Sequence, residues 1–228
     1  MIDFHTHQVN TASTDIQVLN LLQPLPISLP QVISAGEVVF SVGLHPWYLD
    51  DSTLAAEKLK MEALANEPNV LFMGECGLDR LCNTPFKLQE EAFIWQISLA
   101  EKLQKPMVIH CVKAYSELIA IKKKVKPTVP MIVHGFNANE QICKQLIQHG
   151  FYLSFGAALL NEKSNAYHLL SIIPKKYLFL ETDDKNCTIS SIFARASHLL
   201  AISVEDLQEI ILQNFISVSK NRIVTLKD

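Results

Sequence analysis

The chain has 228 residues, of which 49% are hydrophobic and 19% are charged, and its formal net charge is −3 at pH 7. This balance is typical of a globular protein with enough apolar material for a core, and it argues against a large basic surface for nucleic acid. The sequence has no basic leader followed by an apolar run and no run of membrane-spanning length. We therefore expect a cytoplasmic protein that does not enter a membrane.

Short apolar runs alternate with helical patterns along the chain. Strands are predicted at 2–7, 38–45, 70–75, 107–110, 131–134, 151–155 and 177–183. Helices are predicted after Ser52, from Pro85 to Lys105, from Tyr115, over 139–149 and after Ser203. Residues 15–22 fit either a strand or a short helix, so an eighth strand is not evident. The alternation predicts a parallel sheet with helices outside it.

The chain shows no internal repeat, low-complexity tract or linker, so we expect one domain over 1–228 and no obligate protein partner. The five cysteines are Cys76, Cys82, Cys111, Cys143 and Cys187. Their number is odd and no C-x-x-C spacing occurs, which indicates reduced thiols. Cys76 and Cys111 directly follow polar residues at strand ends, so alternation turns them toward the helices as packing residues.

Polar residues stand at the ends of most predicted strands. In the first strand, alternation places Asp3, His5 and His7 on one face. The later strands end in His45, Glu75, His110, His134 and Asp183. Because the carboxyl ends of parallel strands meet at one edge of a sheet, we expect these side chains to converge.

Six of these residues have the chemistry of metal ligands: His5, His7, Glu75, His110, His134 and Asp183. Imidazole and carboxylate without thiolate suit an open catalytic site for zinc, manganese, iron or magnesium. Six ligands exceed the needs of one tetrahedral zinc, whereas two ions about 3.5–4 Å apart that share a carboxylate would use them all. Ligands on five strands of an open sheet would span roughly 20 Å. The sequence therefore predicts an α/β fold of the TIM-type (β/α) barrel, compact or distorted around the eighth strand.

The chain resembles the TatD family of metal-dependent hydrolases, which have amidohydrolase-type barrels. The motifs that carry the resemblance are DFHTH at 3–7, VGLHPW at 42–47, MGECGLD at 73–79, PMVIHC at 106–111, IVHGF at 132–136 and LETD at 180–183. Gln89, Phe93 and Gln96 also fit the family pattern. The ordered set covers nearly the whole chain and is specific even though each motif alone is not.

The resemblance implies how the ligands are shared. It implies that His5, His7 and Asp183 hold one divalent ion, that His110 and His134 hold a second, and that Glu75 bridges both. The ions would be zinc, magnesium or manganese. The implied activity is hydrolysis of a phosphodiester, typically in DNA, through a metal-activated water whose proton we expect Asp183 to accept.

At positions close in sequence to the candidate ligands, the chain departs from the family pattern. Val112 and Lys113 follow the fourth-strand histidine where the family usually has an arginine, and Asp184-Lys185 replaces a usual Ser-Pro. We expect His45 and Lys113 to contact the substrate phosphate. Asp3 and Glu181 share strand faces with ligands, which predicts that they orient a ligand histidine.

Two other functions use the same residues. A metal-dependent ester or amide hydrolase, such as a deacylase of aminoacyl-tRNA, would direct the same water at a carbonyl carbon. A non-catalytic scaffold would keep the metals for stability alone. The role of Asp79 is also open. This residue fits either a turn after Gly77 or a contact with the substrate.

Overall fold

The computed structural model describes residues 1–220, which group into two compact units. Unit 1 consists of Met1–Leu19, Ile33–Val38 and the chain from Val133 onward, and unit 2 consists of Asn20–Val32 and Val39–Ile132. The predicted domain over 1–228 includes residues 221–228, which lie outside the described residues. That single domain stays a prediction.

The eight strands follow one another in the sheet in chain order. They are β1 (Ile2–Thr6), β2 (Ile16–Leu21), β3 (Glu37–Val42), β4 (Val70–Asp79), β5 (Met107–Val112), β6 (Met131–Val133), β7 (Phe151–Phe155) and β8 (Leu178–Leu180). The pairs β1–β2, β3–β4, β4–β5 and β7–β8 are parallel. This order is the topology of a (β/α) barrel, so the predicted fold class is confirmed. The segment at 15–22 contains the eighth strand, β2.

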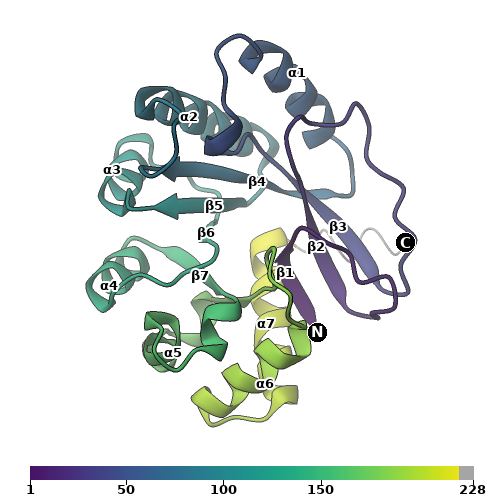
Figure 1. Cartoon of the computed structure of the whole chain (residues 1–228), viewed down its shortest axis with the longest axis vertical. Coiled ribbons are helices and arrows are strands. Elements are labelled where there is room, and N and C mark those ends of the chain that lie inside the picture. The colour runs from purple at the N-terminus through teal and green to yellow at the C-terminus, as the bar shows by residue number, and fades with distance from the viewer. Residues whose placement is uncertain (221–228) are drawn as a thin grey trace. The chain divides into compact units, whose positions relative to one another are not determined.

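Unit 2 is built around β4 and β5. Its helices are α1 (Leu54–Ala65), α2 (Phe86–Leu103) and α3 (Tyr115–Val125), with α2 packed on β4 and α3 on β5 (Figure 1). β4 is longer than predicted, because it continues past Glu75 to Asp79. Gly77 permits this extension: its φ is +144°, and a Cβ there would lie 2.0 Å from the carbonyl oxygen of His110. Glycine therefore lets β4 lie close against β5.

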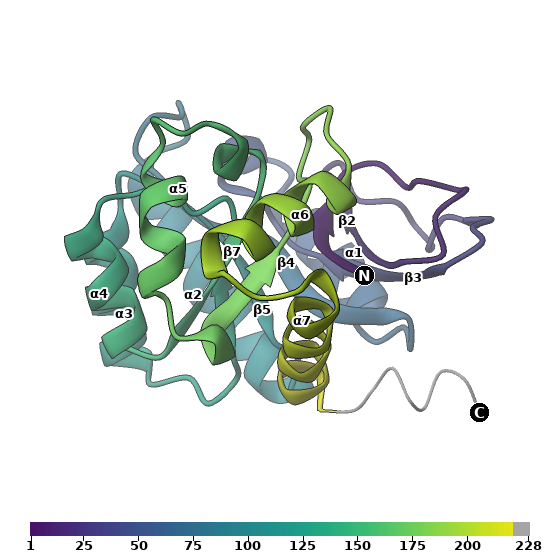
Figure 2. The same cartoon turned by 90° about the horizontal axis from the view of Figure 1, so that it is seen from below.

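Unit 1 contains β1, β7 and β8. Its helices are α4 (Glu140–Gln148), α5 (Asn165–Leu169), α6 (Ile189–Leu200) and α7 (Val204–Ser219); α7 contacts β1 and β8, and α6 packs on α7 (Figure 2). Phe4 of β1 is fully buried and stacks on Phe179 of β8, with 4.2 Å between ring centroids. It meets Phe215 of α7 edge to face. These ring contacts join β1 to β8, next to the polar residues that follow the rings in the sequence.

Helix α3 begins at Tyr115, as predicted. The side chains of Asn139 and Ser203 cap α4 and α7 at the predicted starts of these helices, accepting backbone N–H groups of Ile142 and Asp206. Helix α1 begins after Thr53 rather than Ser52, without a side-chain cap bond. Short 3-10 helices lie at η1 (Pro46–Tyr48), η2 (Ala157–Leu160), η3 (Leu170–Ile172) and η4 (Lys175–Tyr177). Among residues 1–220, none of the helices has the length and apolarity that crossing a bilayer requires.

Candidate metal centre

In unit 1, three ligand-type side chains come together, one from within β1 and two from the residues that follow β6 and β8. One donor atom from each of His5, His134 and Asp183 lies within 4.8 Å of the other two. The His5 side chain is fully buried, and its ring centroid is 4.4 Å from that of His134. Nε2 of His7 is 3.3 Å from Oδ1 of Asp183. Nitrogen and oxygen ligands stand about 2.0–2.2 Å from a zinc ion, so donor atoms this close together can share one ion.

Backbone contacts with β1 fix Asp183. Its N–H donates to the His5 carbonyl at 2.9 Å, and its own carbonyl accepts the His7 N–H at 3.3 Å. Its φ is +58°, a left-handed conformation that costs a non-glycine residue on the order of 1–3 kcal/mol. The two bonds to β1 hold this conformation. The next residue, Asp184, is exposed and pairs with Lys185 at 2.5 Å.

Two buried carboxyl groups accompany this cluster. Asp3 accepts hydrogen bonds from the N–H and hydroxyl of Thr182, at 2.9 and 2.6 Å. Burial raises the pKa of Asp3 to about 7, against the lowering effect of these bonds. Glu181 is fully buried; its Oε1 accepts the Gly135 N–H at 2.6 Å and lies 3.5 Å from Nδ1 of His134. Glu181 thus stands beside a ligand-type histidine, whereas Asp3 is bonded to the residue preceding Asp183.

The side chains of β1 do not follow the strict alternation that the sequence predicts. Asp3 and Thr6 should point to opposite faces, yet both line a cavity of about 440 Å³ together with Asp183. The pairing with β2 explains the difference, because Asp3 is opposite Gln17 while Thr6 is opposite Leu19. Three steps along β1 match two along β2, and such a slip changes the face on which a side chain emerges.

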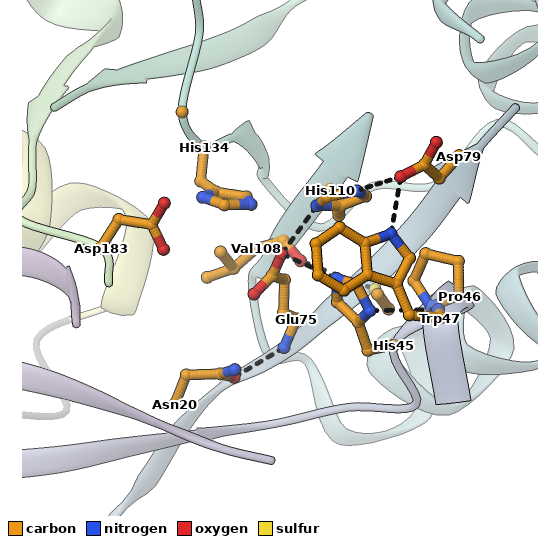
Figure 3. A network of polar contacts seen from close by, with 12 residues as sticks. Asn20, His45, Pro46, Trp47, Glu75, Asp79, Val108, His110, His134 and Asp183 are labelled. Carbon is orange, nitrogen blue, oxygen red and sulfur yellow. Dashed lines mark hydrogen bonds and ion pairs between the residues drawn. The ribbon is translucent and has the colours of Figure 1, made fainter. Parts of the chain in front are cut away.

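In unit 2, a second cluster forms from a residue that follows β3 and from residues within β4 and β5. One donor atom from each of His45, Glu75 and His110 lies within 4.8 Å of the other two. Oε1 of Glu75 is 3.1 Å from Nε2 of His45 and 2.9 Å from Nδ1 of His110 (Figure 3). All three residues are buried. The backbone N–H of Glu75 donates to Oδ1 of Asn20 at 2.8 Å.

Hydrogen bonds distinguish the roles of the two histidines. Nδ1 of His45 accepts the Trp47 N–H at 3.2 Å, so a neutral His45 carries its proton on Nε2 and donates it to Glu75. This arrangement makes His45 a donor that holds Glu75. In His110, Nε2 faces Asp79 at 3.1 Å, so a proton on Nε2 can be donated in a hydrogen bond to Asp79. Nδ1 then keeps its lone pair, which can bind a metal.

Asp79 and Trp47 adjoin this cluster, although neither has a clear role from the sequence alone. Oδ2 of Asp79 accepts the indole N–H of Trp47 at 2.6 Å as well as contacting His110 (Figure 3). Burial alone would raise the pKa of Asp79, but hydrogen bonds from Trp47, His110 and the Leu81 N–H outweigh it and lower the pKa below its usual value. Asp79 is therefore an ionised acceptor at the end of β4, and its position directly after the GECGL run was the available signal.

The remaining predicted residues are placed as follows. Lys113 is exposed, with φ +53°, between β5 and α3. The five cysteines are free, as predicted, and Cys76 and Cys111 are buried. Burial raises the pKa of both thiols, so they are packing groups rather than nucleophiles. In unit 1, the structure groups His134 with His5 and Asp183, whereas the resemblance assigned His134 to the ion held by His110.

The strand order and these clusters define a (β/α) barrel with candidate metal ligands at the carboxyl ends of its strands. A family model described as TatD related DNase matches residues 27–220, and the chain belongs to this family. Among solved structures, a TatD-family hydrolase from Entamoeba histolytica shares the fold with a TM-score of 0.75, at 16% identity over 95% of this chain and 97% of that chain. The TatD homologue YjjV from Escherichia coli K12 has a TM-score of 0.71 at 20% identity, covering 79% of this chain and 76% of its own.

Curated relatives carry names from the same family. The 3'-5' ssDNA/RNA exonuclease TatD of Cronobacter turicensis is 36% identical over 149 residues, which cover 63% of this chain and 56% of that protein. The chain thus spans little more than half the length of that relative. YcfH of Escherichia coli K12, named an uncharacterized metal-dependent hydrolase, is 27% identical over 194 residues, covering 78% of this chain and 72% of its own.

Proposed function

We propose that this protein is a divalent-metal-dependent hydrolase of phosphodiesters, and that its substrate is single-stranded nucleic acid. The observation that carries the proposal is the cluster of His5, His134 and Asp183, whose donor atoms lie within 4.8 Å of one another. Family membership and the exonuclease name of a relative support the reaction class. The ligands have the chemistry expected for zinc, manganese or magnesium.

In this proposal, each cluster serves one ion. His5, His7, His134 and Asp183 are the ligands available in unit 1, and Glu75 and His110 are those available in unit 2. Glu75 would supply a carboxylate to the metal centre, as the family resemblance implies. When bound, divalent ions neutralise charge on a phosphoryl oxygen and lower the pKa of a water molecule.

The protein's own side chains orient these groups and move protons. Asp183 takes a proton from the attacking water, which requires a carboxylate within hydrogen-bond reach. His45 donates to Glu75 and so fixes one carboxylate oxygen. Asp79 holds the proton of His110 on Nε2, which orients that ring through its other nitrogen.

Charge explains how an acidic protein attracts an anionic substrate. When bound, divalent ions would add positive charge against the carboxylates of the two clusters and so attract an anionic substrate. Lys113 adds an exposed ammonium group after β5, and we assign it a contact with the substrate phosphate. Because lysine is a point charge rather than a bidentate fork, it attracts phosphate without fixing its orientation. Residues 1–228 act as one hydrolase domain in this proposal.

Metal removal tests the proposal directly. Protein stripped with dipicolinate should lose cleavage of a labelled single-stranded oligodeoxynucleotide, and added Zn²⁺, Mn²⁺ or Mg²⁺ should restore it, with metal content measured in parallel. A matched panel of p-nitrophenyl acetate and aminoacyl-tRNA tests the ester alternative. Full nuclease activity without bound metal would refute the mechanism, and metal-dependent ester cleavage without nuclease activity would favour the deacylase.

A further inference from the structure

Trp47 presents a large aromatic surface beside the unit 2 cluster. It lies in η1, directly after His45 and Pro46, and 54% of the residue is exposed. Its ring centroid is 5.0 Å from that of His45 and 5.6 Å from that of His110, in edge-to-face arrangements. The exposed part of the indole gains no stability from burial, so this surface is available for contact with a ligand.

The indole is also fixed in orientation. Its N–H donates to Oδ2 of Asp79 at 2.6 Å, the oxygen that also faces Nε2 of His110 (Figure 3). The backbone N–H of Trp47 donates to Nδ1 of His45. The side chain and the backbone of Trp47 are therefore tied to two different residues of the cluster. A ring held in this way loses little conformational entropy when a ligand stacks on it.

We propose that Trp47 is a stacking platform for a nucleobase next to the cleaved phosphodiester. This inference rests on the proposed function and adds the part of the substrate that the metal ligands do not contact. Every base has a π-face, so a stacking platform accepts single-stranded substrates with little sequence preference.

A different role for the indole would be to cover His45 and His110 from water. The two roles predict different responses to the base of the substrate. A cover acts equally on any phosphodiester, whereas a platform acts only on one that carries a base. Trp47→Leu keeps an apolar cover and removes the aromatic face, and Trp47→Phe keeps a face but loses the bond to Asp79.

The experiment compares kcat and KM for two single-stranded oligomers of equal length. One is a mixed-sequence oligodeoxynucleotide, and the other carries a tetrahydrofuran abasic residue at every position. For Trp47→Leu we expect the preference for the base-bearing oligomer, as a ratio of kcat/KM values, to fall by roughly 5- to 150-fold, mainly through KM. Trp47→Phe should lie between Leu and the wild type. Trp95→Leu, on α2, is the control and should leave the ratio unchanged.

An unchanged ratio in Trp47→Leu, or an equal loss on both oligomers, would overturn the platform. If the wild-type protein with divalent ions cleaves neither oligomer, the proposed function fails and the platform is judged by binding. In a Trp95→Phe, Asp183→Asn protein, Trp47 is the remaining tryptophan, since the sequence has two. Quenching of its fluorescence by the base-bearing oligomer and not by the abasic one would support stacking, and equal or absent quenching would refute it.

Discussion

In unit 2, the candidate ligands contact neighbouring side chains, whereas Asp183 of unit 1 is held through its backbone. In unit 2, the imidazoles of His45 and His110 each contact Glu75, and Asp79 contacts His110 from the other side. In unit 1, Asp183 is fixed by backbone bonds to β1, and its side chain lies 3.3 and 3.7 Å from the nearest imidazole nitrogens of His7 and His5. In unit 2, neighbouring side chains therefore orient the ligand-type histidines, and in unit 1 backbone bonds position Asp183.

This difference predicts two kinds of mutational response. A change next to a ligand in unit 2 should alter metal affinity and catalysis while the fold persists. A change at Asp3 or Thr182 in unit 1 should mainly lower the free energy of unfolding, because these two residues join β1 to the end of β8. The ligands themselves should show the largest loss of activity in either unit.

Asp183→Asn gives the largest expected effect. The asparagine keeps the shape and one oxygen but loses the charge that binds a cation and the basicity that accepts a proton. Hydrolysis of a labelled oligonucleotide should fall by roughly 10²–10⁴-fold, the range for losing a general base. The urea unfolding midpoint should change little, because the backbone bonds of Asp183 do not involve its side chain.

Asp184→Asn is the matched control for this change. Asp184 is the adjacent aspartate, but its carboxylate is exposed and contacts Lys185. We expect activity within about twofold of the wild type, since surface ion pairs contribute little. An inactive Asp184 variant beside an active Asp183 variant would move the ligand assignment by one residue and refute the unit 1 cluster.

Asp79→Asn should have the next largest effect, and it should appear in metal binding. The amide puts an N–H or an oxygen of lower charge against His110 and Trp47, so the orientation of His110 weakens. Loss of such a partner typically costs 10–100-fold in metal affinity or activity. Isothermal titration of stripped protein with Zn²⁺ measures this loss, and urea unfolding measures any change in stability.

Asp51→Asn supplies the comparison for Asp79. Asp51 is an exposed aspartate of the same unit, at the turn before α1. It should bind metal like the wild type. If Asp79→Asn bound metal normally but unfolded at a much lower urea concentration, the proposal that Asp79 orients His110 for metal binding would be wrong.

Thr182→Val tests the unit 1 side of the comparison. Valine keeps the shape of threonine but cannot donate to Oδ2 of Asp3, which is buried. An unsatisfied buried acceptor costs about 1–3 kcal/mol, so the free energy of unfolding in urea should fall by that amount. Activity at saturating metal should fall less than in Asp79→Asn. A stable Thr182→Val protein with strongly impaired metal binding would show that the Thr182–Asp3 bond serves metal binding rather than stability.

The sequence indicates which residues are candidate ligands, but it does not indicate their contacts. A histidine or carboxylate that ends an apolar strand is visible as a break in hydrophobicity, which located Glu75, His110, His134 and Asp183. The barrel followed because ligands on many strands must converge. The register slip in β1 was not visible, and it moves Asp3 from the expected face to the cavity beside Thr6.

The unit 2 network was hidden for a related reason. Asn20, Trp47, Asp79 and His110 are separated by many residues, and each alone looks like an ordinary loop or strand-end residue. The prediction ended the strand at Glu75, so Asp79 was read as a turn residue. Its role depends on β4 continuing beside β5, which Gly77 permits through close backbone contact. Strand length and register depend on such tertiary contacts rather than on local pattern.

Lys113→Ala should have the smallest effect, confined to substrate binding. Lys113 lies outside both ligand clusters, and its exposed ammonium group has no role in holding a metal in our proposal. Losing one exposed charge contact with phosphate should raise KM by roughly threefold to tenfold, with kcat nearly unchanged, and the effect should shrink as salt rises.

Lys126→Ala separates this contact from a general effect of charge or backbone. Lys126 is also exposed, also has a left-handed backbone (φ +54° against +53° for Lys113), and lies at the other end of α3. The two variants therefore remove the same charge from the same kind of backbone conformation. KM should rise for Lys113→Ala alone. Equal changes in KM would show that only net charge matters, and the phosphate contact assigned to Lys113 would then be wrong.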